Sequence, residues 1–110
     1  MAEKKYWPFK VLPVEQQTDQ HKKEIGFLET AYREGFRSYQ FWAGDLGAEA
    51  PNGRIGEIVI RGQRGWEVIL YAGDEDVAST FTHDIEEAGQ AVLAWLRGSD
   101  AATALQACRS

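Results

Sequence analysis

The chain has 110 residues, a length that suits one domain with a single core and requires no disulfide or structural metal. Hydrophobic residues make up 44% of it and charged residues 26%, which excludes an intrinsically disordered protein. The net charge of −5 is uneven, since residues 65–110 hold two Lys or Arg against eight Asp or Glu. This acidic part repels phosphate backbones and favours basic partners.

The lengths of the apolar runs and the number of cysteines indicate where in the cell the protein is located. Residues 1–10 lack the apolar stretch of roughly 7–15 residues that a signal peptide needs. The longest apolar run, residues 68–72, is far below the roughly 20 residues of a membrane span. Cys108 is the only cysteine and has no partner for an internal disulfide. These features predict a cytoplasmic protein that makes no membrane contact.

The first two expected elements are a strand and a helix. Residues 6–12 alternate in polarity, but Pro8 and Pro13 lack a backbone N–H, so this segment is at best an edge strand. Residues 18–34 have helical periodicity, with a capping residue at Thr18 or Asp19 and Gly35 at the end. The expected buried stripe consists of Ile25, Leu28 and Tyr32, with Ala31 beside it. A strand over residues 25–30 remains the alternative, because Gly26 and Thr30 weaken a helix there.

An aromatic segment follows. Residues 36–43 predict a strand with Arg37, Tyr39 and Phe41 on one face. Phe36, Ser38, Gln40 and Trp42 occupy the other face. Residues 44–54 are expected to be a long loop, functional or mobile, in which Pro51, Asn52 and Gly53 form a turn.

Residues 55–72 predict a β-hairpin. A three-residue loop, residues 63–65, pairs Arg61 with Glu67, Val59 with Ile69 and Glu57 with Tyr71. The opposite face then collects only apolar side chains: Ile58, Ile60, Trp66, Val68 and Leu70. After an acidic turn, residues 73–76, a third strand over residues 77–82 is expected to add Val77 and Phe81 to this core face.

A closing helix begins after Asp84, whose carboxylate can cap it while Glu87 reaches back. Its expected buried stripe is Ile85, Ala88, Val92, Trp95 and Leu96, and Gly98 ends it. The whole pattern predicts an α+β fold, with an antiparallel sheet of four to five strands. The chain order is strand, helix, three or four strands and a final helix packed on one face. Residues 1–98 form the single domain, and residues 99–110 are expected to be a weakly ordered tail.

Signals for catalysis are absent from the sequence. His83 and Glu87, four residues apart, could share a metal or a proton, but acidic residues here are what a helix N-terminus prefers. Asp74, Glu75 and Asp76 are too few oxygen ligands for calcium. Cys108 has no neighbour in the sequence that would lower its pKa. We therefore expect no enzyme, no catalytic residue, no metal and no cofactor.

Binding to another protein is the leading hypothesis for function. Val59, Ile69 and Tyr71 form an apolar patch on the outer face of the hairpin. Three alternatives are open for this patch. The first helix covers it, a protein partner or a second copy of the chain contacts it, or it is simply exposed. The remaining expected partner-binding residues are the acidic ones of the following turn: Asp74, Glu75 and Asp76. They favour a basic partner, as for an inhibitor, an immunity-type protein or an adaptor.

The alternative function is binding of single-stranded nucleic acid. Aromatic side chains on a sheet can stack bases while arginines contact phosphates. The residues that this hypothesis names are Arg33, Arg37, Tyr39, Phe41, Arg61 and Arg64. The acidic balance of the chain makes this the weaker of the two hypotheses.

Overall fold

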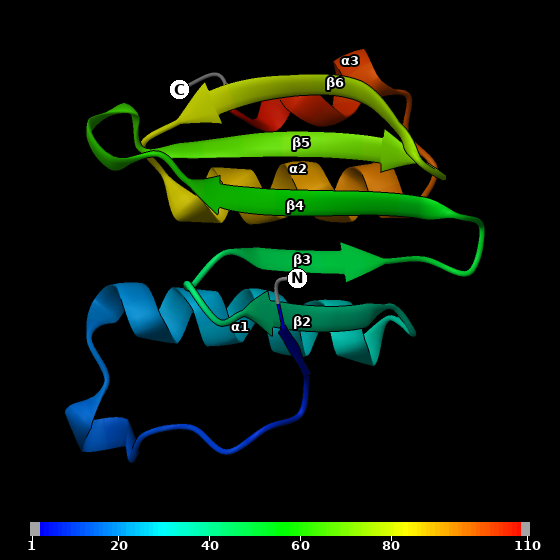
Figure 1. Ribbon diagram of the computed structural model, residues 1–110. Helices are drawn as coiled ribbons and strands as arrows, with labels where there is room; N and C mark the ends of the chain where they lie inside the picture. Colours follow the sequence, from blue (N-terminus) through cyan, green and yellow to red (C-terminus); the bar gives the residue numbers. More distant parts are fainter. Residues whose placement is uncertain (1–2, 109–110) are drawn as a thin grey trace.

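The structure is a computed structural model that describes residues 3–108. It contains one six-stranded antiparallel sheet with its helices on one side (Figure 1). The strands are β1 (Lys4–Tyr6), β2 (Arg37–Phe41), β3 (Leu46–Glu49), β4 (Arg54–Ile60), β5 (Trp66–Ala72) and β6 (Glu75–Thr82). The helices are α1 (Asp19–Arg33), α2 (Ile85–Leu96) and α3 (Ala101–Leu105), with 3-10 turns η1 (Val14–Gln16), η2 (Gly62–Arg64) and η3 (Gln106–Cys108). The predicted α+β class is confirmed.

The strand order follows the chain from β1 to β6, so each strand pairs with its sequence neighbours. Only β1 and β2 are separated by a helix, α1, which crosses behind the sheet. The sheet therefore has six strands, where four to five were expected.

Helix α1 has the predicted ends. The Thr18 side chain accepts a hydrogen bond from the His21 N–H, and Gly35 follows the helix with a φ of +90°. Residues 25–30 are helical, which decides against a strand. The buried residues of α1 are Phe27, Leu28 and Ala31, whereas Tyr32 is 49% exposed. The expected stripe was therefore wrong at Tyr32 and only partly right at Ile25, which is half-buried, and Phe27 is buried instead.

Close approach of α1 and α2 explains why Phe27, and not Tyr32, is buried. A Cβ on Gly89 of α2 would lie 3.2 Å from Cδ1 of Phe27. A larger residue at position 89 would crowd that ring, so Gly89 lets Phe27 pack against α2.

Strand β3 was not predicted, because residues 44–54 were expected to form a loop. Its sequence is Leu, Gly, Ala and Glu, of which the last three are poor strand formers. Pairing with β2 on one side and β4 on the other supplies its backbone partners. The long loop is therefore two short turns with a strand between them, and the predicted turn at Pro51, Asn52 and Gly53 is confirmed.

The hairpin of β4 and β5 has the predicted faces but a different register. Ile60 pairs with Trp66 and Glu57 with Ile69, a shift of two residues from the expected pairs. The cause is a five-residue connection, closed by a hydrogen bond from the Arg61 N–H to the Gly65 carbonyl. An even shift leaves every side chain on its predicted face.

Two assignments on β6 were wrong. Phe81 pairs with Glu67, so it lies on the face away from the helices. Val77 is the extra residue of a bulge, because Leu70 pairs with Ala78 and Tyr71 with Asp76. The register with β5 decides which side of β6 faces the helices, and it selects Ala78, Thr80 and Thr82.

Helix α2 was predicted well. The Asp84 carboxylate accepts from the N–H groups of Glu86 and Glu87, and the whole expected stripe is buried. The Glu87 side chain accepts from Thr82 Oγ1 at 2.9 Å, and Thr82 Oγ1 in turn accepts from the Asp84 N–H. In a capping box the Glu87 side chain would accept the hydrogen bond from the Asp84 N–H. Here Thr82 accepts that bond instead.

The segment expected to be a weakly ordered tail folds back onto the domain over its described part. Helix α3 and turn η3 pack against α2 and β6, and Ala104 is fully buried. The Arg54 guanidinium lies 3.9 Å from the Trp95 ring and donates to the carbonyls of Trp95 and Ser99. Arg54 thereby ties the start of this segment to the end of α2.

The core is a single apolar cluster between the helices and one face of the sheet. Among the described residues, no helix is long and apolar enough to cross a membrane.

Candidate functional site: the open face of the sheet

The most prominent surface is the sheet face opposite the helices, which we call the open face. All three helices lie behind the sheet in Figure 1, and no described helix covers its front. The strand registers and alternation place the following residues on it: Lys4, Tyr6, Arg37, Tyr39, Phe41, Glu49, Ile55, Glu57, Val59, Glu67, Ile69, Tyr71, Asp76, Ser79 and Phe81. Both hypotheses from the sequence therefore concern the same surface.

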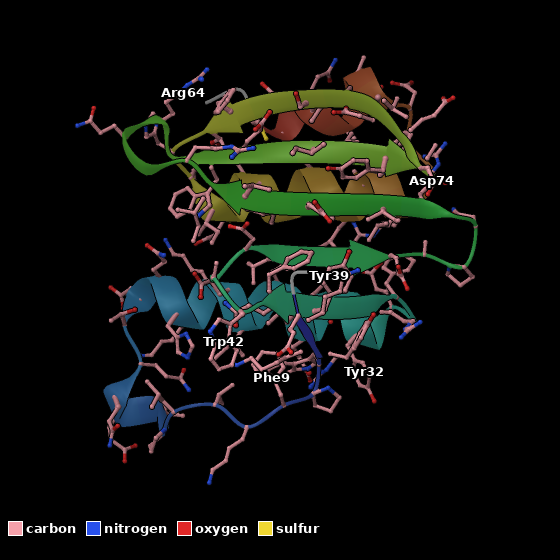
Figure 2. All side chains as sticks on the ribbon, viewed as in Figure 1. Phe9, Tyr32, Tyr39, Trp42, Arg64 and Asp74 are labelled. Carbon is pink, nitrogen blue, oxygen red and sulfur yellow. The ribbon has the colours of Figure 1, made fainter. Side chains whose placement is uncertain are left out.

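An aromatic cluster centred on Tyr39 forms one part of the open face. The Tyr39 ring is 1% exposed because it lies over Gly47, where a Cβ would be 2.5 Å from Tyr39 Cε1. The rings of Tyr6 and Phe41 contact it edge to face, with centroids 5.6 and 5.4 Å away. Lys4 Nζ lies 4.4 Å from its centroid. The Tyr39 ring is thus packed among neighbouring side chains and is not freely exposed (Figure 2).

Glu57 and Tyr71 lie beside this cluster, near the middle of the open face. The Tyr71 hydroxyl donates to Glu57 Oε1 at 3.4 Å. Burial raises the pKa of Glu57 above its ordinary value, although the Tyr71 hydrogen bond and Lys4 act in the opposite direction. Burial and the carboxylates of Glu57, Asp76 and Glu67 raise the pKa of Tyr71. Tyr71 therefore lies in a negative environment.

The arginines of the nucleic-acid hypothesis are mostly engaged with carboxylates. Arg37 Nη1 lies 3.3 Å from Glu49 Oε1, and Arg61 Nε lies 2.9 Å from Glu67 Oε1. Arg33 belongs to α1, where it pairs with Glu29, so it is not on the open face. Arg64 has its guanidinium 3.8 Å from the Phe81 ring centroid. Of the six residues named for nucleic acid, five lie on or beside the open face and Arg33 does not.

The two groups of expected partner-binding residues meet at Tyr71. Asp76 pairs directly with Tyr71 across β5 and β6. Asp74 is exposed in the turn that joins these strands, and Glu75, also exposed, is the first residue of β6. The turn therefore covers residues 73–74, where residues 73–76 were expected. Figure 2 shows Asp74 and Arg64 at opposite ends of the sheet, so the acidic turn lies far from the η2 loop.

The apolar patch is smaller than the sequence suggested. Ile69 is only 8% exposed, and Val59 is half-buried. Helix α1 packs on the opposite face of the sheet, so it does not cover them. The cross-strand neighbours of Ile69 on the open face are Glu57 and Ser79.

The other residues considered as catalytic or metal-binding candidates do not come together in one site. His83 Nε2 lies 3.0 Å from the Gln63 carbonyl oxygen, whereas Glu87 accepts from Thr82. Burial raises the pKa of the Cys108 thiol to about 11, which keeps it protonated at neutral pH. Within residues 3–108, no group of three or more His, Cys, Asp or Glu is placed to hold a metal ion.

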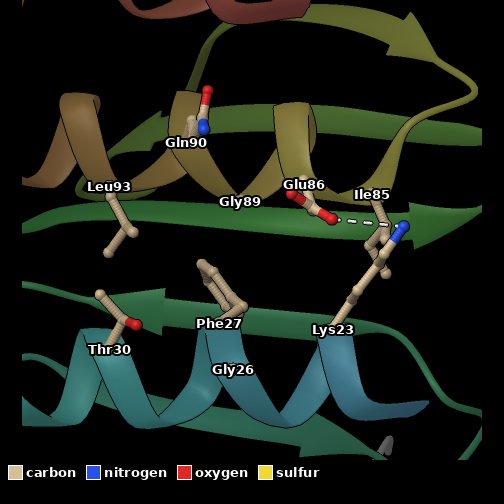
Figure 3. Close-up of a pocket in the computed structure, with 9 residues that line it drawn as sticks. All are labelled: Lys23, Gly26, Phe27, Thr30, Ile85, Glu86, Gly89, Gln90 and Leu93. Atoms are coloured by element: carbon tan, nitrogen blue, oxygen red, sulfur yellow. Dashed lines mark ion pairs between the residues drawn. The ribbon is translucent and has the colours of Figure 1, made fainter. Parts of the chain in front are cut away.

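A groove lies between α1 and α2 on the helix side of the molecule (Figure 3). Phe27, Ile85 and Leu93 form its floor and are each less than a tenth exposed. Lys23 Nζ and Glu86 Oε1 form an ion pair of 3.2 Å at its rim. Its floor belongs to the core, so the groove is the seam between two helices.

The exposure of two apolar residues, Ile60 and Trp42, was missed. Ile60, expected in the core, is 45% exposed at the end of β4. Trp42, in the turn between β2 and β3, is 80% exposed, although the alternation had placed it on a strand face. The strand ends at Phe41, so the alternation stops before Trp42. The glycine at position 44, with a φ of +107°, was the available signal that a turn begins there.

Comparisons with protein-family models, with curated proteins and with solved structures found no match for this chain.

Proposed function

We propose that this protein is a non-catalytic binding module whose open face takes a positively charged segment of another protein. The observation that carries the proposal is the position of Tyr71. It is an aromatic side chain among the carboxylates of Glu57, Glu67 and Asp76, with the exposed acidic turn beside it. A Lys or Arg side chain placed there would contact the aromatic ring and offset the negative charge.

The state of Glu57 supports the same partner. Its carboxylate is partly buried, and its pKa is raised because the charged form is incompletely solvated. A partner's cation would stabilise that charged form. The charged form of Glu57 is thus disfavoured in the free protein, and binding of a basic segment would stabilise it.

Single-stranded nucleic acid is the alternative ligand. Its support is the stacking of cations on aromatic rings, by Lys4 on Tyr39 and by Arg64 on Phe81. Its weakness is that Arg37 and Arg61 are already paired with carboxylates. A phosphate backbone would have to compete for them.

Selection from a random peptide display library tests the main proposal. We expect enriched peptides to carry Lys or Arg, and amide NMR signals of β4, β5 and β6 to shift on binding. Changing Asp74 and Asp76 to Lys should slow association and reduce its salt dependence. The matched control is Glu15→Lys, an equal charge change at an exposed residue of η1.

Three outcomes would contradict the proposal. They are enrichment without basic residues, shifts confined to α1 and α2, and equal slowing by Glu15→Lys. An oligothymidine that binds with a steep salt dependence, and shifts the signals of Tyr39 and Phe41, would instead establish the alternative.

A further inference from the structure

The two edges of the sheet are unlike each other. Strand β6 ends the sheet with eight residues, and no described backbone group forms a hydrogen bond with its outer side. In Figure 1, helix α3 lies behind β6, and part of it extends past the outer edge of that strand. The opposite edge, β1, has three residues and is followed by Trp7 and Pro8. A short strand next to proline is protected against pairing, whereas β6 keeps a regular run of unpaired residues, 78–82, beyond the bulge at Val77.

Opposite charges lie at the two ends of β6 on the open face, the positive one supplied by Arg64 of η2. Asp76 lies at one end, beside Tyr71. Phe81 lies near the other end, with the Arg64 guanidinium 3.8 Å from its ring. The regular part of the strand between them is polar and small, and it contains neither Lys nor Pro.

We propose that β6 pairs with β6 of a second copy of this chain, antiparallel, about a two-fold axis at Ser79. A two-fold axis normal to the sheet keeps both open faces on one side. Ser79 would then face its own symmetry mate, and Phe81 would lie opposite the bulge that contains Val77. Val77 is 45% exposed, so this contact covers an apolar side chain that is otherwise in water.

Charge complementarity selects this arrangement. In the antiparallel pair, the Arg64 that stacks on Phe81 of one copy comes beside Asp76 of the other. The symmetry forms this contact twice. A parallel pair would instead place the two acidic ends together. The proposed dimer joins two sheets and two open faces into one continuous surface.

Sedimentation equilibrium of the full chain tests the proposal without requiring any ligand. We expect a monomer–dimer equilibrium that Arg64→Glu weakens at least about tenfold, and Asp76→Arg likewise, because each change removes two symmetry-related contacts. The double variant, R64E with D76R, should recover most of the association. Glu15→Lys, remote from β6, should leave it unchanged.

A disulfide trap tests the axis. In a background with Cys108→Ser, Ser79→Cys should form a covalent dimer on mild oxidation, because residues facing each other on paired strands lie within disulfide range. The control is Ala43→Cys, in the exposed turn after β2.

A monomer at about 1 mM would overturn the proposal. So would a dimer that neither charge variant weakens, or equal crosslinking at positions 43 and 79. The peptide selection does not depend on dimerisation, so failure of one proposal is distinguishable from failure of the other.

Discussion

Gly47 and Gly26 show how differently two glycines act in this fold. Tyr39 occupies the space in which a Cβ of residue 47 would lie, whereas nothing lies within 4 Å of a Cβ on residue 26. We expect Gly47→Ala to displace the Tyr39 ring and to lower the free energy of unfolding by about 1–3 kcal/mol. Urea denaturation followed by circular dichroism measures this.

The control is Gly26→Ala, at an exposed position inside α1. Alanine is a better helix former, so this change should raise the free energy of unfolding by about 0.5–1 kcal/mol. Equal effects of the two substitutions would show that Tyr39 does not depend on Gly47.

Glu57 makes stability depend on pH. Because its pKa in the folded protein is raised above 4.5, the folded state binds this proton more tightly than the unfolded state. The stabilisation is complete below 4.5 and is lost as the pH rises through the raised pKa. Glu57→Gln removes that loss, so the variant should gain stability over the parent at about pH 7 and not at about pH 4.

Denaturation of both proteins at these two pH values checks the prediction. Glu15→Gln, at an exposed residue, is the control for a simple change in net charge. A gain of equal size at both pH values would be incompatible with a raised pKa of Glu57.

At the scale of elements, Trp95 holds α2 to the sheet. Its side chain is 4% exposed, and its indole N–H donates to the Tyr71 carbonyl at 3.0 Å. Trp95→Ala should leave a cavity and cost about 3–5 kcal/mol. Thermal unfolding measures this, with Trp42→Ala as a control of the same chemistry at an 80% exposed site. The control should change the free energy of unfolding by less than about 0.5 kcal/mol. A melting temperature of Trp95→Ala equal to that of the parent would contradict the role of Trp95 in holding α2 to the sheet.

The helices were predictable as elements because their signals are local. Thr18, Gly35, Asp84 and Gly98 lie where a cap or a stop is needed, and each acts within a few residues of the helix end. Strand β3 was not predictable, because its residues have little strand preference and its partners lie on both sides in the sheet.

At the scale of the whole molecule, the meander order predicts a gradient of local stability. Strands β4 and β5 pair on both sides and contact α2, whereas β1 pairs on one side over three residues. Amide hydrogen exchange should therefore be slowest in β4 and β5 and fastest in β1 among the strands. Uniform protection across the sheet would contradict this gradient.

The candidate site also emerges only at this scale. Val59, Ile69 and Tyr71 were assigned to the outer face from the period of two along each strand, and that assignment holds. Phe81 was assigned to the wrong face, because its side depends on the pairing of β6 with β5. The charges that surround Tyr71 come from three strands and were not predicted as a group.

The sequence by itself determined the fold class, both long helices and the two faces of the β4–β5 hairpin. Each of these follows from interactions within a few residues or from a repeated polarity pattern. Only the tertiary structure decided the sixth strand, the register and the side of the sheet on which α1 packs. It also decided that no helix of residues 3–108 covers the open face, because these features depend on contacts between segments that are distant in the chain.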